Sequence, residues 1–220
     1  DGLLLSGAKF SEKVMVLSAH ARGEIQKVDG WRIGAPLIFS RLWEETGCKA
    51  AIEEALKGRR FSFDLERAVF LAVLHRLVVS GSDRSADHWK TNYRIEGAEK
   101  LQLHHAYRAM GFLGKPLPES QQDRKPGAVP LAPRCRKDVV EEALFERRRH
   151  LYTSLSMAFF DTTTFYFEGH GGQSIGKRGF SKDHRPDLPQ MVAGVVMDQE
   201  GRPICCEMWP GTTSDVTTLL

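Results

Sequence analysis

One aspartate stands where a carboxylate is unusual. Asp161 lies in the run MAFFDTTTFYF of residues 157–167, whose β-branched and aromatic residues predict a β-strand. Aspartate has poor β-propensity, and a buried carboxylate without a partner is costly, so we expect Asp161 to be buried beside a compensating group. Two interpretations stay open: a structural partner such as an arginine, or a divalent metal such as Mg²⁺, which prefers hard oxygen ligands.

A glycine-rich, basic segment follows that strand. Residues 171–187 read GGQSIGKRGFSKDHRPD, and their flexible glycines would let the backbone approach phosphate groups closely. The spacing GxxxxGK[ST] of a nucleotide-binding P-loop is absent. Contact with phosphates and a solvated hairpin loop are therefore the two alternatives for this segment. Its charged residues are Lys177, Arg178, Lys182 and Arg185, against Asp183 and Asp187.

The histidines and cysteines predict no metal or nucleophilic site. His170 and His184 are far apart and lack other candidate ligands nearby. The cysteines show no CxxC spacing, and Cys205 and Cys206 lie in a strand-like run in which neighbouring side chains point to opposite faces. We expect free, buried thiols in a reducing cytoplasm.

The first two-thirds of the chain predict helices. The spacing of apolar residues favours helices at 36–46, 48–56, 65–79, 82–93, 99–113 and 137–155. Asp64 is the predicted N-cap of helix 65–79, which is almost continuously apolar and therefore central and buried. The run Arg147-Arg148-Arg149 is interpreted as a solvated face rather than a DNA-contacting patch. In helix 36–46 the apolar stripe contains Leu37, Phe39, Leu42 and Trp43. In helix 99–113 the candidate core contacts are Leu101, Leu103, Tyr107, Met110 and Leu113.

The last third predicts strands followed by a helix. Residues 157–167, 190–198 and 203–209 have strand composition, and the turn residues 199–202 join the last two into a hairpin. Ser214 is a plausible N-cap for a helix that begins at Asp215. The predicted fold class is α+β or α/β: an N-terminal helical region, then three strands and a helix.

Four short segments in the last third carry a family resemblance. They read FFDTTT at 159–164, GFSKDHRPDLPQ at 179–190, GRPI at 201–204 and GTTSD at 211–215. In this order they resemble the front half of the catalytic domain of DDE transposases from bacterial insertion sequences, the group with an Asp-Thr-Thr first motif. The SKDHRPDLPQ run is the specific signal, and the match covers about residues 156–220.

The resemblance implies an RNase H-like fold, of which this chain holds the first three strands and the first helix. It implies that Asp161 is the first acid of the Asp-Asp-Glu triad. The second Asp and the Glu have no match before Leu220, so the catalytic domain is expected to be truncated. Asp215 belongs to a Gly-Asn-x-x-Asp-like segment, with Thr212 where Asn is common, and is not the second acid.

The implied activity is DNA transposition: cleavage and strand transfer at insertion-sequence ends. It uses two Mg²⁺ (or Mn²⁺) ions about 3.5–4 Å apart. Asp161 alone cannot hold two ions, so we expect these residues not to cleave DNA by themselves. The expected partners are DNA, as terminal inverted repeats and target, and further copies in a synaptic complex. Lys177, Arg178, Lys182, His184 and Arg185 are the candidate DNA contacts, and the roles of Asp183, Asp187 and Asp215 stay open.

Two other functions remain alternatives: a non-catalytic remnant that binds DNA or another subunit, and a metal-dependent nuclease of the same fold. Composition only bounds the choice. The 220 residues are 41% hydrophobic and 27% charged, which excludes wholesale disorder, and the net charge of +3 is compatible with nucleic acid without demonstrating it. No apolar run approaches the ~18 residues of a membrane span. With the resemblance, this predicts a protein of the bacterial cytoplasm, associated with the nucleoid.

The predicted organisation has three parts. Residues 1–115 form a helical region with DNA binding or dimerisation as its role, and residues 116–136 form a proline-rich surface connection with little regular structure. Residues 137–220 form a connecting helix and the first half of the catalytic domain. The chain begins with Asp1 rather than Met and stops at Leu220 in the last predicted helix, which indicates a piece of a longer protein.

Overall fold

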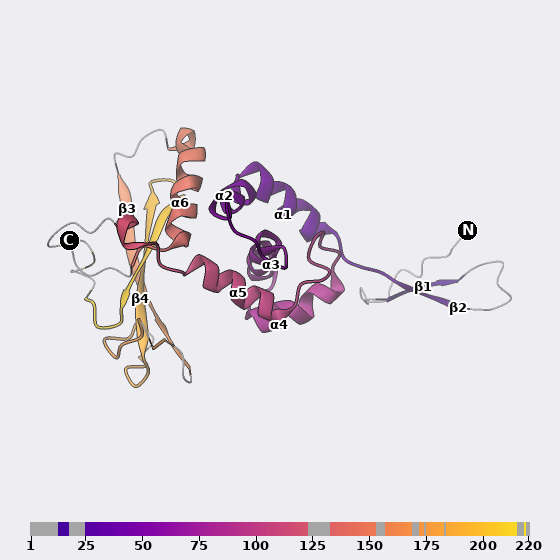
Figure 1. The fold of residues 1–220 in the computed structure, drawn as a ribbon. Helices are drawn as coiled ribbons and strands as arrows, with labels where there is room; N and C mark the ends of the chain where they lie inside the picture. Colours follow the sequence, from indigo (N-terminus) through magenta and orange to yellow (C-terminus); the bar gives the residue numbers. More distant parts are fainter. Residues whose placement is uncertain are drawn as a thin grey trace. The chain divides into compact units, whose positions relative to one another are not determined.

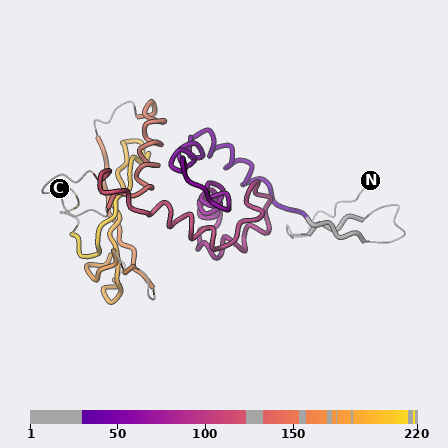
Figure 2. Tube along the Cα trace, in the orientation of Figure 1, coloured from indigo at the N-terminus to yellow at the C-terminus, as the bar shows by residue number. Residues whose placement is uncertain are grey.

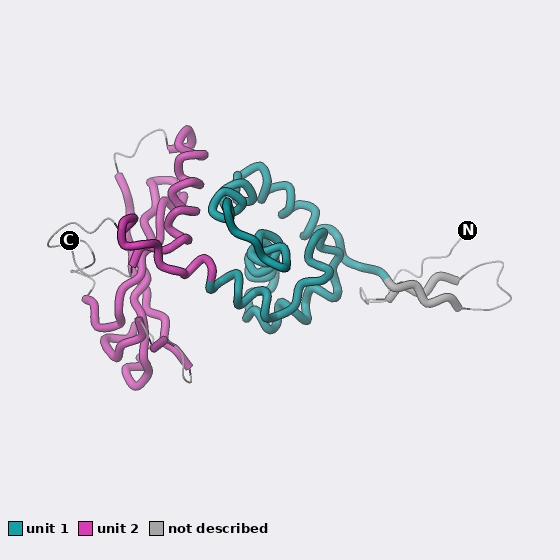
Figure 3. Tube along the Cα trace, viewed as in Figure 1, with its two compact units in different colours: residues 1–111 teal, residues 112–220 magenta. Residues whose placement is uncertain are grey.

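The computed structural model describes residues 13–17, 25–122, 133–152, 157–168, 172–173, 175–182, 184–214 and 218, with the backbone alone described at 13–17 and 25–29. The chain divides into two compact units, residues 1–111 and residues 112–220 (Figure 3). The boundary lies close to the end of the predicted helical region. Each unit is described by itself.

Unit 1 opens with two short strands. β1 (Lys13–Leu17) and β2 (Ile25–Asp29) pair antiparallel, with Lys13 opposite Asp29 and Leu17 opposite Ile25. The prediction that the first two-thirds are helical is wrong here. Val14 and Val16 alternate as in a strand, but Ile25 and Val28 do not, and five residues are too few for periodicity alone to separate a strand from irregular chain.

The rest of unit 1 is helical, as predicted. Its elements are α1 (Gly34–Glu45), α2 (Cys48–Ala55), α3 (Leu65–Val78), α4 (Asp83–Trp89), the 3₁₀ turn η1 (Lys90–Asn92) and α5 (Leu103–Leu113) (Figure 1). α1, α2 and α4 all contact α3, which is the buried centre of the unit. The predicted cap is confirmed, because the Asp64 carboxylate accepts the Arg67 backbone N–H at 3.0 Å.

In α1 and α5, the residues that are buried differ in part from the predicted core contacts. Leu37 is 68% exposed and Leu42 is also exposed, whereas Trp43 turns inward and meets the Phe70 ring edge-on at 5.4 Å. α1 packs on α3 from one side only, so its apolar residues divide between two faces. α5 begins at Leu103, four residues later than predicted, and it leaves Tyr107 exposed.

A charged group lies inside unit 1. Glu66, only 4% exposed, accepts the Trp43 indole N–H at 2.5 Å and the Arg67 guanidinium through both carboxylate oxygens, at 2.6 and 2.7 Å. Burial alone would lower the pKa of Arg67, but the hydrogen bond and charge of Glu66 raise it. This cluster joins α1 to the first turn of α3, so its integrity bears on the stability of the whole unit.

Unit 2 contains a helix and an antiparallel sheet. α6 (Arg136–Arg147) and the 3₁₀ turn η3 (Arg149–Leu151) precede β3 (Ala158–Tyr166), β4 (Gln190–Asp198) and β5 (Pro203–Pro210), which lie in the order β3-β4-β5. All three strands were predicted. Figure 2 follows the described chain through these elements in sequence colours.

α6 is shorter than the predicted helix 137–155. It ends at Arg147 because Arg148 leaves helical geometry (φ −108°), and the Tyr152 ring then packs at 5.0 Å from Phe145. The Arg149 guanidinium lies 3.6 Å from the Glu146 carboxylate with both side chains well exposed, as expected for a solvated face. Residues 153–156 lie outside the described residues.

One lysine joins α6 to the edge of β5. The Lys137 ammonium donates to the Cys206 carbonyl at 2.6 Å and to the Glu141 carboxylate at 2.9 Å, and the same Glu141 oxygen accepts the Cys206 N–H at 3.3 Å. Burial lowers the pKa of Lys137, but its bonds to Asp138 and Glu141 raise it further. Lys137 therefore stays charged and fixes the helix against the strand.

The turn between β4 and β5 is closed by a buried carboxylate. Asp198, 1% exposed, accepts the backbone N–H groups of Glu200 and Arg202 and the Arg202 side chain, at 2.8 to 3.0 Å. Burial would raise the pKa of Asp198, but these hydrogen bonds lower it below its ordinary value. Gly201 takes the left-handed conformation (φ 76°) that the tight turn requires.

The proline-rich connection is more ordered than predicted in the part that the structure describes. Pro116 pairs with Cys135, and the Gln122 amide donates to the carbonyls of Leu117 and Arg134. Residues 123–132 lie outside the described part. None of the described helices is long and apolar enough to cross a membrane.

Candidate active site

β3 has two different faces, which place the residues around Asp161. Thr162 and Thr164 are buried on one face, and Asp161, Thr163 and Phe165 are exposed on the other. The alternation follows from the period of two of a β-strand. Asp161 is opposite Val195 on β4, in the middle of the paired strands.

The buried face holds β3 firmly through aromatic packing. The Phe160 and Trp209 rings meet edge to face at 6.2 Å, and Gly194 lies under them as the partner of Thr162 in the register. A Cβ at Gly194 would lie 2.7 Å from the Phe160 ring and 2.8 Å from the Trp209 ring, so only glycine fits. The strand that carries Asp161 is thus fixed from the side opposite to its carboxylate.

The Asp161 carboxylate faces outward. One of its oxygens accepts the Thr162 backbone N–H at 2.8 Å, and no lysine or arginine in the described residues forms an ion pair with it. The expected burial of Asp161 is wrong: its neighbours on the same face, Phe159 and Phe165, are 50% and 52% exposed. The structural partner that burial would have required is not present in this part of the chain.

Lys182 connects the basic segment to β3. Its ammonium donates to the Thr162 carbonyl at 2.5 Å and to the Thr162 hydroxyl at 2.9 Å, and its backbone N–H donates to the Thr164 hydroxyl at 3.1 Å. Lys182 thereby fixes the segment beside the residue that follows Asp161. It was predicted as a DNA contact, but these bonds give it a positioning role.

The described part of the basic segment is partly packed against the sheet. Lys177 and Gln190 exchange backbone hydrogen bonds at 2.9 and 3.0 Å, and Ser181 is buried. A Cβ at Gly179 would lie 2.0 Å from the Gly211 carbonyl oxygen, so the segment lies directly against the end of β5. The segment is thus packed at Gly179 and Ser181, while Lys177, Arg178 and Phe180 stay exposed.

The remaining predicted contacts of this segment differ in availability. Lys177 and Arg178 are exposed. His184 is exposed and has a positive φ of 56°. Arg185 forms two 3.0 Å hydrogen bonds to Asp187, which hold the pKa of Asp187 below its usual range, and its guanidinium lies over the Tyr166 ring. Asp183, Asp215 and His170 lie outside the described residues.

Gln190 is a polar residue that sequence analysis did not single out. It is fully buried at the start of β4, and neither its amide nitrogen nor its amide oxygen has a hydrogen-bond partner within the described residues. A buried amide without partners costs stability. The only sequence signal was its place at the end of the SKDHRPDLPQ run, where it resembled an ordinary first residue of a strand.

The donors for a metal are limited in the described residues, where no group of three or more His, Cys, Asp or Glu side chains is placed to hold an ion. All four cysteines are free and half-buried, and burial raises the pKa of Cys205 and Cys206, which disfavours thiolate ligands. Asp161 fits a hard cation as one accessible oxygen ligand.

β3 thus carries one outward carboxylate on one face, while the segment that holds the exposed cations Lys177 and Arg178 is tied through Lys182 to the opposite face of the same strand. Such groups suit a phosphate-bearing substrate approached through a metal, because the cations neutralise phosphate oxygens. Comparison with models of protein families, with curated proteins and with solved structures finds no match. The function of this site must therefore be inferred from its residues and geometry.

Proposed function

We propose that this chain is a portion of a DDE transposase that cleaves DNA and joins strands at the ends of an insertion sequence. The observation that carries the proposal is the outward, accessible carboxylate of Asp161 on the first strand of an antiparallel trio. No cation of the described residues pairs with this carboxylate, so its oxygens are accessible to a divalent ion. The resemblance of residues 156–220 to this transposase group supports the same assignment.

In this proposal the residues have separate roles. Asp161 would hold a divalent ion as one oxygen ligand, and the chemistry such ions would supply is activation of a water or a DNA 3′-hydroxyl and stabilisation of the leaving oxygen. Lys182 positions the basic segment through Thr162 and Thr164. Lys177 and Arg178 are the cations available to bind DNA phosphates.

The resemblance implies two further acids of the triad, and neither has a match within these 220 residues. The 220-residue chain should therefore bind DNA without cutting it. The proposed partners are the terminal inverted repeats, target DNA and further copies of the protein, in the cytoplasm of a bacterium near its nucleoid.

The proposal is tested with the complete protein that contains these residues. It should nick DNA that carries the element ends in the presence of Mg²⁺ or Mn²⁺ and not in the presence of a chelator. Failure of the purified, folded protein to nick such DNA with either ion would contradict the enzymatic proposal and favour a DNA-binding or subunit-binding remnant.

A prediction follows for the exposed cations. Replacing both Lys177 and Arg178 with alanine should flatten the dependence of log K for DNA binding on log salt, by about 0.9 for each phosphate that the protein no longer neutralises. The measurement is fluorescence anisotropy of labelled duplex DNA with the 220-residue chain at several salt concentrations. Lys182 and Arg185 stay unchanged, because both side chains also form hydrogen bonds within the protein, and replacing them would disturb the fold as well as DNA binding.

The matched control removes the same charge elsewhere on unit 2. Replacing Arg147 and Arg149, both exposed, should leave the slope unchanged if α6 presents a solvated face. Equal slopes in the wild type and the Lys177/Arg178 variant would show that these cations do not contact phosphates.

A further inference from the structure

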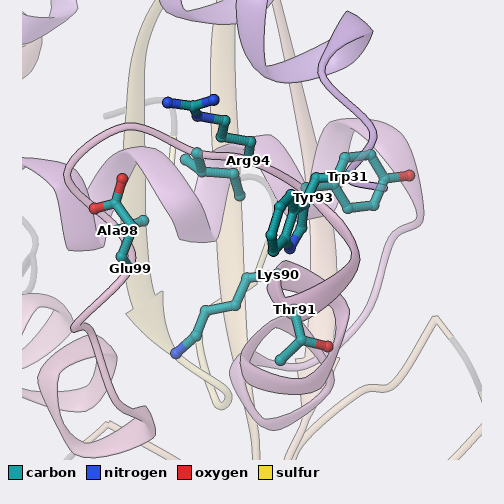
Figure 4. Close-up of a pocket in the computed structure, with 8 residues that line it drawn as sticks. Trp31, Lys90, Thr91, Tyr93, Arg94, Ala98 and Glu99 are labelled. Carbon is teal, nitrogen blue, oxygen red and sulfur yellow. The ribbon is translucent and has the colours of Figure 1, made fainter. Parts of the chain in front are cut away.

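Unit 1 contains a hollow that the proposed cleavage site does not use. It encloses about 600 Å³ between Trp31 and residues 90–99 (Figure 4), within the range of about 300–1,000 Å³ that holds small ligands. Its floor includes Ile95 and Ala98, which are 3% and 2% exposed. The hollow therefore has a buried apolar base within a single folded unit.

The walls of the hollow are tied together across the sequence. The Arg32 N–H donates to the Asn92 carbonyl at 3.0 Å, and the Arg94 N–H donates to the Arg32 carbonyl at 3.1 Å. The Tyr93 ring stacks on Trp89 at 4.1 Å and lies under the Arg32 guanidinium. These contacts hold Trp31 beside residues 90–99 before any ligand arrives, which lowers the entropic cost of binding.

The groups around the hollow differ in what they can still bind. The Lys90 ammonium already has acceptors within the protein, because it donates to Asp87 at 2.5 Å and to the Leu101 carbonyl. Arg94 and Glu99 are exposed and form no ion pair in the described part of the chain. Figure 4 shows Arg94 at one end of the hollow, Trp31 and Tyr93 along one side, and Glu99 on the other.

An exposed indole beside a guanidinium that forms no ion pair in the described residues can bind an aromatic ring together with an anionic group. Trp31 is 58% exposed, so a face of its indole ring is accessible to a ligand. Any of the nucleic-acid bases can stack on an aromatic ring, so this contact does not depend on the nucleotide sequence. A guanidinium group binds phosphate oxygens in a bidentate manner. A carboxylate opposite the ring can accept N–H groups from the edge of a base.

We propose that this hollow binds a nucleotide, with the base stacked on Trp31, the phosphate paired with Arg94, and an amino group of the base donating to Glu99. The site does not depend on Asp161 or on DNA cleavage. Its occupant is either a free mononucleotide or an unpaired nucleotide within a single strand, since both present the same base and phosphate.

The test measures binding of AMP, adenosine, single-stranded oligo(dA) and a DNA duplex to the 220-residue chain by calorimetry. Trp31→Ala should lower the affinity for AMP and for oligo(dA) by about 10-fold, and Trp31→Phe should retain most of the affinity for both. Arg94→Ala should lower the affinity for AMP several-fold and leave the affinity for adenosine unchanged, because adenosine lacks the phosphate. Lys100→Ala, an exposed cation next to the hollow but not lining it, should change nothing.

Comparing the affinities for AMP and for oligo(dA) shows whether the occupant is a free mononucleotide or a nucleotide within a strand. Oligo(dA) binding far more tightly than AMP, with both weakened in Trp31→Ala, assigns the hollow to an unpaired nucleotide of a strand. AMP binding as tightly as oligo(dA) assigns it to a free mononucleotide. No binding of either, or binding that Trp31→Ala and Arg94→Ala leave unchanged while circular dichroism shows both variants folded, overturns the proposal.

Discussion

Replacing Asp161 with asparagine is expected to lower metal-dependent DNA nicking by the complete protein by about 10³-fold. Asparagine keeps the shape of the side chain but removes the negative charge that attracts a divalent ion. Metal catalysis contributes several kcal/mol to the stabilisation of the transition state, and each 1.4 kcal/mol is about tenfold in rate. The measurement is the initial rate of nicking of supercoiled DNA that carries the element ends.

Folding should be unaffected by this change, because Asp161 is exposed and accepts only the Thr162 N–H within the described residues. The matched control is Glu168→Gln, which changes an exposed carboxylate two residues after β3 to an amide and should keep full activity. A rate in Asp161→Asn equal to that of Glu168→Gln would remove Asp161 from the catalytic site.

The second large effect concerns the stability of unit 1. Replacing Glu66 with alanine should lower the free energy of unfolding by about 3–5 kcal/mol, since it leaves the Arg67 guanidinium partly buried without its partner. The Trp43 indole N–H loses its acceptor in the same step. The measurement is urea denaturation of the 220-residue chain, followed by tryptophan fluorescence and by circular dichroism.

Two variants make this result interpretable. Glu45→Ala removes an exposed carboxylate that pairs with Arg41 and should cost less than about 1 kcal/mol. Replacing Glu66 and Arg67 together with leucine should cost less than Glu66→Ala alone, because no unpaired charge is then left inside. A decrease below about 1 kcal/mol for Glu66→Ala would show that the cluster does not stabilise the unit.

The sequence predicted the elements whose signals are local. The strands at 158–166, 190–198 and 203–210 follow from β-branched and aromatic composition, and the cap of α3 follows from one aspartate before an apolar run. Such signals involve residues within about one turn or one hairpin. Interactions across longer separations in the sequence left no local pattern.

The wrong predictions share a physical cause, because burial depends on what packs against an element. Leu37 and Phe39 both fit an apolar stripe, but only the position of α3 decides which of them is covered. Asp161 was expected to be buried because aromatic residues surround it in sequence, yet Phe159 and Phe165 are themselves exposed. The bond of Lys182 to Thr162 and the meeting of Trp31 with Tyr93 join segments that no short motif connects.

The central claim, that Asp161 is a ligand of the catalytic metal, is tested most directly by Asp161→Cys in the complete protein. A thiolate is a softer ligand than a carboxylate and binds Mg²⁺ poorly, while Mn²⁺ accepts it more readily. The account predicts that nicking by this variant is abolished in Mg²⁺ and partly restored in Mn²⁺, with the wild type active in both. Nicking that survives in Mg²⁺, or that falls equally with the two ions, would contradict it.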